Sequence, residues 1–132
     1  DVSFVSCNHA REGTLNPAWG GNRHFRAQPF DLMTLVKYNY ISTMSLILAK
    51  DCPKFDELLG RLEDWDLFLT MAFAGKKGHW IDEELFTAIY KNDDLSLQDW
   101  DHYMEWYLKV LKKHYNREKG KQSMGWITPI EG

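Results

Sequence analysis

The stretch Arg61-Leu62-Glu63-Asp64-Trp65-Asp66-Leu67-Phe68-Leu69 is the part of this sequence that decides the fold. Hydrophobic residues recur through it and beyond it at steps of three and four, at Leu58, Leu62, Trp65, Leu69 and Ala72. This spacing places one apolar stripe along a helix from about Leu62 to Ala74. Gly75 follows and is expected to end the helix.

The carboxylates of Asp64 and Asp66 diverge on such a helix, because residues two apart lie about 200° from each other around its axis. The letters Asp64-Trp65-Asp66 match the Asp-x-Asp motif that holds a divalent metal in many sugar-nucleotide enzymes. A hard cation needs oxygen ligands that converge on one point. We therefore reject a metal site here, and likewise at Asp99-Trp100-Asp101, which lies in the next predicted helix.

Glu63 and Asp64 fall in the first helical turn, where the free N–H groups and the helix dipole stabilise an anion by about 0.3 to 1 kcal/mol. Two interpretations follow from this position. The acidic pair caps the helix, as acidic residues at helix starts often do. Alternatively, an ionised Asp64 acts as a general base.

Three segments in a fixed order resemble the acceptor half of a glycosyltransferase family 2 domain. They are Asn39-Tyr40-Ile41, then Phe55-Asp56-Glu57-Leu58-Leu59, then the acidic stretch from Arg61, and Asp82-Glu83-Glu84-Leu85 continues the likeness. The resemblance covers about residues 31 to 90. It implies a partial GT-A-like domain.

The resemblance also implies an activity and roles for individual residues. Asp64 would be the general base of an inverting transfer from a nucleotide sugar to a glycan or a lipid-linked acceptor, as in polysaccharide biosynthesis. Glu63 would support Asp64 or position the acceptor. The cleft would be lined by Asn39, Trp19, Arg23 and His79, although Trp19 and Arg23 also suit a surface loop and a lone His is usually structural.

The same family comparison predicts that residues 1–132 are a domain fragment, the acceptor-binding half, with a tail over 120–132. A family domain begins with a nucleotide-binding half, and no segment of this sequence resembles it. Mg²⁺ or Mn²⁺ is expected in the full enzyme, bound by residues outside this chain, and the isolated fragment is expected to be inactive. A Gln-x-x-Arg-Trp motif of processive synthases is not found in the sequence, which favours transfer of a single sugar.

The composition bounds the remaining function classes. The 132 residues suit one domain, and a net charge of −3 argues against a nucleic-acid surface. No stretch has the length of a membrane span or the pattern of a signal peptide. Cys7 and Cys52 lack a metal-type spacing and suit a reduced, cytoplasmic chain, with a disulfide between them as the alternative.

The sequence predicts an α/β protein, α+β within this fragment, with a few strands packed with three main helices. Strands are expected over residues 2–7, 24–30 at an edge, 41–49 in the sheet centre, and 79–86, with a long loop over 8–21. Asp31 should cap a helix from Leu32 to Tyr38.

A helix of about twenty residues from Leu97 is predicted by an apolar stripe that includes Trp100, Met104, Tyr107, Leu108, Leu111 and Tyr115. Its end is basic, with Lys112, Lys113, His114, Arg117, Lys119 and Lys121. This end suits a solvated helix terminus, and the alternative is peripheral contact with the anionic inner face of a membrane.

The rival functional class is a non-catalytic module that binds carbohydrate or a partner protein through aromatic residues. The catalytic hypothesis requires Asp64 in a cleft, whereas the module hypothesis expects Asp64 to serve as a cap. Exposed apolar strand edges would also favour self-association of the fragment.

Overall fold

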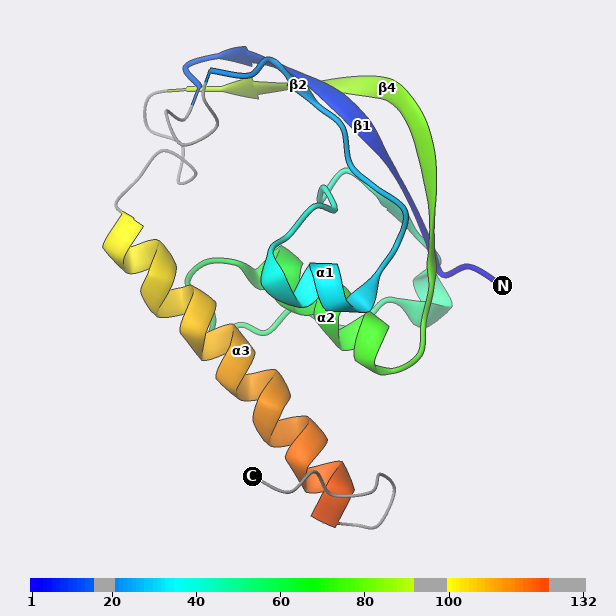
Figure 1. The fold of residues 1–132 in the computed structure, drawn as a ribbon, viewed down its shortest axis with the longest axis vertical. Helices are drawn as coiled ribbons and strands as arrows, with labels where there is room; N and C mark the ends of the chain where they lie inside the picture. The colour runs from blue at the N-terminus through cyan, green and yellow to red at the C-terminus, as the bar shows by residue number, and fades with distance from the viewer. Residues whose placement is uncertain (16–20, 92–99, 124–132) are drawn as a thin grey trace.

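The computed structural model describes residues 1–15, 21–91 and 100–123 and has a mixed α+β fold. Its elements, in chain order, are β1 (Phe4–Gly13), β2 (His24–Phe25), α1 (Leu32–Lys37), β3 (Leu46–Ile47), a 3-10 helix (Ala49–Asp51), α2 (Glu63–Phe73), β4 (Gly78–Tyr90) and α3 (Trp100–Ser123). The strands β1 and β4 arc side by side over α1 and α2, and α3 runs along the edge of this body (Figure 1). The α+β class and the three main helices are confirmed.

The strand β1 is the centre of a four-stranded sheet. It pairs antiparallel with β2, where His9 lies opposite Phe25, and with β3, where Phe4 lies opposite Ile47. On its other side it pairs in parallel with β4, and the register shifts twice near Asn8. Such irregularities bend a strand, which fits the arc that β4 makes over the helices (Figure 1).

The buried amide of Asn8 ties this bend to its surroundings. Its Nδ2 donates to Asp82 Oδ1 (2.8 Å), and its Oδ1 accepts from Ala27 N–H (2.8 Å) and from Trp80 Nε1 (2.9 Å). Arg26 also binds the Asp82 carboxylate, and these hydrogen bonds, that of Arg26 first, lower the pKa of Asp82 to about 2. A polar residue can therefore sit inside the sheet, since both ends of its amide are satisfied.

The helix α2 forms as the apolar spacing predicted, and it supplies much of the core. Trp65 is fully buried, donates from Nε1 to Leu35 O (2.7 Å) and stacks on Tyr107 of α3 at 4.9 Å. Gly75 has φ +83°, and its N–H donates to Ala72 O as the helix ends. Leu58 does not join the stripe: it precedes the helix and is 86% exposed, so that part of the prediction is wrong.

Two strand and loop predictions are wrong. The loop expected from Asn8 is instead a continuation of β1 to Gly13, stabilised by pairing with β4. The central strand expected over 41–49 is reduced to Leu46–Ile47, because Ile41 is drawn into the core and Ser45 N–H donates to Ser42 O in a turn. Leu46 is 77% exposed, so this segment is an edge and not a covered centre.

The helix α1 and the strand β2 form where the sequence predicted them. Asp31 caps α1 by accepting from Thr34 N–H at 3.0 Å, and Leu35 is buried beneath it. β2 is an edge strand, though it spans only His24–Phe25. The predicted strand over 79–86 is confirmed and is longer in the structure.

The helix α3 is confirmed, and its buried face matches the predicted stripe in part, because Tyr107 and Leu111 pack against the core. Among the α3 side chains that the structure describes, Val110 and His114 are fully buried, whereas Leu108 and Tyr115 are exposed. His114 and Lys113, which are not part of the predicted stripe, contact the buried Asp66 of α2. Leu97 lies outside the described residues.

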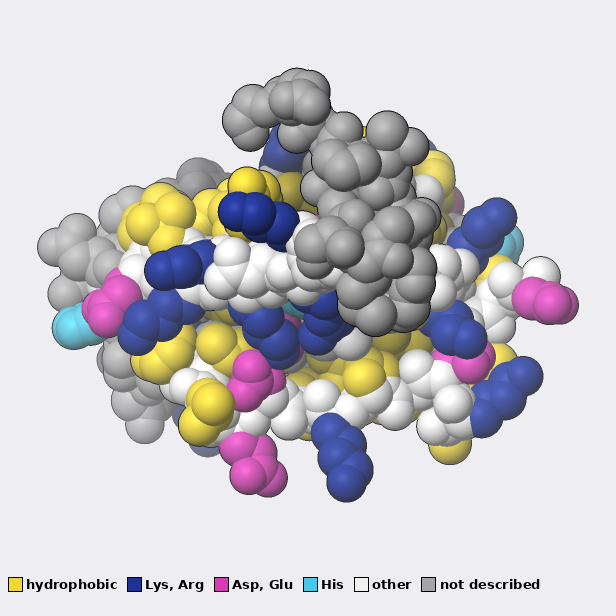
Figure 2. Space-filling model, turned by 90° about the horizontal axis from the view of Figure 1, so that it is seen from below, with side chains coloured by type: hydrophobic (Ala, Val, Ile, Leu, Met, Phe, Trp, Pro, Cys, Tyr) yellow, Lys and Arg dark blue, Asp and Glu magenta, His cyan; other side chains and the backbone are white. Residues whose placement is uncertain are grey.

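These contacts also change the interpretation of the basic end of α3. Lys113 and His114 point to α2 and are not part of a free basic surface. Seen from below, Lys and Arg side chains lie among hydrophobic and acidic ones over this face (Figure 2). In the described part of the chain no helix has the length and apolar character needed to cross a membrane. Peripheral membrane contact stays a prediction.

An apolar hollow of about 210 Å³ lies on the sheet surface, lined by residues that include Val5, Cys7, Met44, Leu46 and Ile81. Both cysteines are free, and Cys52 is exposed. The hollow provides the exposed apolar surface that self-association of the chain would need, and that association stays a prediction.

Gly78→Ala should destabilise the fold by about 1 to 3 kcal/mol, because a Cβ there would overlap the buried Phe4 ring. Gly120→Ala, on the open surface of α3, is the matched control and should stabilise by about 0.5 to 1 kcal/mol. Urea unfolding measures both. Equal effects of the two substitutions would contradict this packing at Gly78.

Candidate functional site

A cavity of about 610 Å³ lies where the N-terminus of α2 meets the sheet and the segment 39–44. Its walls combine aromatic and polar side chains, among them His9, Arg11, Phe25, Asn39, Asp64, Phe86, Tyr90 and Tyr103. A concave site of this size, with a few polar groups among aromatic ones, suits a sugar-sized ligand.

Asp64 lies at the α2 end of this cavity. Its Oδ1 accepts from the N–H of Trp65 at 2.9 Å, and its Oδ2 receives a long hydrogen bond of 3.4 Å from Asn39 Nδ2. The carboxylate thus uses one helix N–H, as the capping interpretation expects, and also borders the cavity, as the catalytic one requires.

Burial raises the pKa of Asp64; the Trp65 N–H opposes the shift, and the Glu63 charge adds to it. A raised pKa makes the ionised carboxylate a stronger base than an exposed aspartate. Because the pKa of Asp64 is higher in the folded chain than in the unfolded chain, the folded chain binds this proton more tightly. The contribution of Asp64 to the free energy of unfolding is therefore full at low pH and is lost as pH rises through the raised pKa.

Two local features hold Asp64 in place. Leu62, the residue before α2, has φ 63°, a left-handed conformation that is unfavourable for a leucine. Strained residues of this kind are often found at functional sites. Asn39 is fixed beside Asp64 because the next residue, Tyr40, is buried and its hydroxyl is bonded to the backbone of Asp31.

The two carboxylates of the Asp-x-Asp letters do diverge. Asp66 is 2% exposed and faces α3, where its oxygens contact His114 Nε2 (2.7 Å) and Lys113 Nζ (2.8 Å). Because the Asp66 oxygens are engaged there, Asp64 and Asp66 do not fit one metal ion. Among the described residues, no group of three or more His, Cys, Asp or Glu side chains could hold a metal. The second such motif, at 99–101, lies in part outside the described residues.

The other predicted site residues are only partly brought together. Glu63 is exposed beside Asp64, and Asn39 lines the cavity. Arg23 is exposed and contacts β1 through its carbonyl, which accepts from Arg11 N–H, and it is not among the residues that line the cavity. Trp19 lies outside the described residues.

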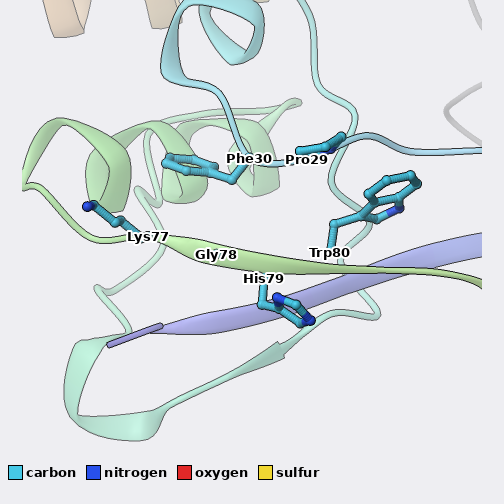
Figure 3. Close-up of a pocket in the computed structure, with 6 residues that line it drawn as sticks. All are labelled: Pro29, Phe30, Lys77, Gly78, His79 and Trp80. Atoms are coloured by element: carbon cyan, nitrogen blue, oxygen red, sulfur yellow. The ribbon is translucent and has the colours of Figure 1, made fainter.

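His79 lies on β4 at a different hollow, of about 370 Å³, lined by Pro29, Phe30, Lys77, Gly78, His79 and Trp80. Trp80 extends from β4 toward Pro29 and Phe30, while His79 points away on the other side of the strand (Figure 3). The structure therefore separates His79 from the Asp64 cavity.

His9 and Arg11 of β1 line the cavity, and the sequence analysis missed both. The available signal was alternation: Val5 and Cys7 share one face of the strand, and continuing the period of two gives His9 and Arg11. Assigning residues 8–21 to a loop ended that pattern too early.

His9→Phe should raise the free energy of unfolding by about 1 kcal/mol, because the buried His9 Nδ1 has no hydrogen-bond partner among the residues that the structure describes. The phenyl ring would keep the stacking on Phe86 (4.8 Å) and the contact with Phe25 (5.1 Å). Urea unfolding checks this. A destabilised variant would show that the imidazole is satisfied in the folded protein.

A scan against protein-family models gives no match to this chain, and a search of curated proteins gives none either.

Proposed function

We propose that this chain is the acceptor-side part of an inverting glycosyltransferase with a GT-A-like domain, and that Asp64 is its general base. The observation that carries the proposal is the placement of Asp64: a carboxylate with a raised pKa, at a helix N-terminus, bordering a cavity of about 610 Å³. Asn39 and Asp64, from separate segments of the family resemblance, meet at this cavity and hydrogen-bond each other.

In the proposed reaction Asp64 takes the proton of an acceptor hydroxyl while that oxygen attacks the anomeric carbon of a nucleotide sugar. The new C–O bond forms as the bond to the nucleotide diphosphate breaks, and the diphosphate leaves with the electron pair. A single displacement inverts the anomeric centre. Glu63 supports the base, since its negative charge helps to raise the pKa of Asp64.

The proposed mechanism gives this chain no binding site for a metal ion that would assist the departing diphosphate. The described acidic residues near the cavity do not converge, so no step is attributed to a bound cation. The residues of the chain would position the acceptor, remove its proton and limit the access of water.

The alternative is a non-catalytic module that binds carbohydrate or protein. The hollow lined by Phe30 and Trp80 is the feature that favours it, because aromatic rings at a concave surface suit sugar stacking (Figure 3). The position of Asp64 on the larger cavity favours catalysis, since a carboxylate that served only as a cap would not need to border it.

The test is product formation by the full-length protein across a panel of nucleotide sugars, each offered with glycan and lipid-linked acceptors. We expect transfer from at least one donor, with the anomeric configuration inverted as read by NMR. Saturable glycan binding without consumption of any nucleotide sugar would favour the module. A retained configuration would exclude the single displacement.

A further inference from the structure

Arg11 lies on a different wall of the cavity from Asp64, and its side chain is held in position. It is 9% exposed, its guanidinium lies over the Phe25 ring at 4.9 Å, and it hydrogen-bonds Tyr90. Both neighbouring rings line the same cavity. A guanidinium fixed in this way presents its donors with little loss of conformational freedom on binding.

His9 lies two residues before Arg11 on the same face of β1, and it is a second polar side chain at this wall of the cavity. It is 7% exposed and lines the cavity, and within residues 1–15, 21–91 and 100–123 its buried Nδ1 has no hydrogen-bond partner. Burial lowers the pKa of His9, and the Arg11 charge lowers it further against an opposing effect of Glu84. A neutral imidazole offers one donor and one acceptor, which suits hydrogen bonding to a sugar hydroxyl.

We propose that this cavity selects an acceptor sugar that carries an acidic group, a carboxylate or a phosphate, and that Arg11 binds that group with His9 beside it. The inference rests on the proposed function. It adds the class of acceptor: an anion near Arg11 and a reacting hydroxyl near Asp64. The forked guanidinium matches a carboxylate or phosphate, and such charge-assisted hydrogen bonds are about twice as strong as neutral ones.

The aromatic residues of the cavity favour a sugar that carries an anionic group over a free anion. Phe86 and Tyr103 line the cavity together with the polar groups. A pyranose ring can stack on such side chains while its hydroxyls reach His9 and Asn39. A carboxylate on the sugar and a phosphate at its anomeric carbon present the same chemistry to Arg11, so the experiment has to separate them.

The experiment measures binding to the full-length protein by calorimetry with three probes: methyl glucuronide, glucose 1-phosphate and the neutral methyl glucoside. We expect at least one acidic probe to bind about tenfold or more tightly than the neutral one. Arg11→Gln should reduce that preference to within about twofold. Lys54→Gln removes the same charge from an exposed position outside the cavity lining and should leave the preference intact.

Preference for glucose 1-phosphate alone would assign a phosphate-bearing acceptor such as a lipid-linked sugar, and preference for the glucuronide alone would assign a uronic acid. Equal affinity for all three probes in the wild type would overturn the proposal, and so would a preference that survives in folded Arg11→Gln. If Arg11→Gln does not fold, Arg11→Lys, which keeps the charge, should retain a reduced preference for acidic probes, and loss of the preference there would also overturn it.

These outcomes are separate from the test of catalysis. Transfer activity without any preference for acidic probes would leave the proposed function standing and remove the acidic-acceptor site. A preference abolished by Arg11→Gln in a protein that transfers no sugar would support the site as part of a binding module.

Discussion

Asp66→Ala is expected to lower the free energy of unfolding by about 3 kcal/mol, because it removes a buried carboxylate and leaves its hydrogen-bond partners His114 and Lys113 without this acceptor. Asp66 and His114 are each 2% exposed, and Asp66 Oδ1 lies 2.7 Å from His114 Nε2. The other carboxylate oxygen, Oδ2, lies 2.8 Å from Lys113 Nζ. Burial by itself raises the pKa of Asp66, but the hydrogen bonds from His114 and Lys113 lower it overall.

The control for Asp66 is Asp56→Ala. Asp56 binds the same Lys113 ammonium at 2.9 Å, but it is more exposed than Asp66, so its removal should cost clearly less than removal of Asp66. In a double-mutant cycle of Asp66→Ala with His114→Ala, we expect a coupling of about 1 to 3 kcal/mol by urea unfolding. Additive effects would show that the pair does not hold α3 against α2.

The stability due to Asp66 should also depend on pH. Because its pKa is lowered in the folded protein, the unfolded chain binds this proton more tightly. The contribution is therefore full above the unfolded pKa and is lost as pH falls through the lowered folded pKa. Asp66→Ala should flatten this acid limb of the stability curve.

Asp64→Asn is expected to lower kcat for sugar transfer by about hundredfold or more, the usual scale for loss of a general base. Asparagine keeps the shape, and its amide oxygen can still accept the hydrogen bond from Trp65 N–H, but it cannot take the proton of an acceptor hydroxyl. The fold should not suffer, because burial disfavours the charged form of Asp64 and the substitution removes that charge. Wild-type or higher thermal stability is the expected companion result.

Glu63→Gln is the matched control for Asp64→Asn. It removes the neighbouring carboxylate in the same helical turn, but Glu63 is exposed and does not line the cavity. We expect a several-fold loss at most. Equal losses in the two variants would assign the effect to the charge of the helix terminus and not to one base.

The elements that the sequence predicted are those whose signal is local. The helix α2 is predicted by apolar residues spaced three and four apart, and α1 by its cap at Asp31. Both signals depend on neighbours along the chain. The position of Asp64 in the first turn of α2 follows from the same spacing.

The wrong predictions share a cause, which is that their outcome depends on distant partners. Asn8 looked like the start of a loop, yet Asp82 and Trp80 satisfy its amide inside the sheet. The alternation over 41–49 resembled a strand, but only Leu46–Ile47 finds a partner, on β1. In α3, the polar residues His114 and Lys113 face α2 because the buried Asp66 of that helix binds both of them.

For the candidate site, the sequence and the family resemblance together pointed to Asp64 and Asn39, which do meet at the cavity. They did not point to His9 and Arg11, because a loop is predicted from Asn8, whereas the structure continues β1 to Gly13 by pairing with β4. The resemblance also implied His79 as a cleft residue, but His79 lies on the other side of β4 from Trp80 and does not line the Asp64 cavity (Figure 3).

The most direct test of the central claim, that Asp64 is the base, is the pH dependence of kcat/KM for sugar transfer in the wild type and in Asp64→Asn. We predict that the wild-type rate rises about tenfold per pH unit on the acid side, up to a pKa above the ordinary aspartate value, because only the ionised carboxylate accepts the proton. In Asp64→Asn the residual rate should be flat across that limb. The same acid limb in both proteins would contradict the account and assign the titration to another group.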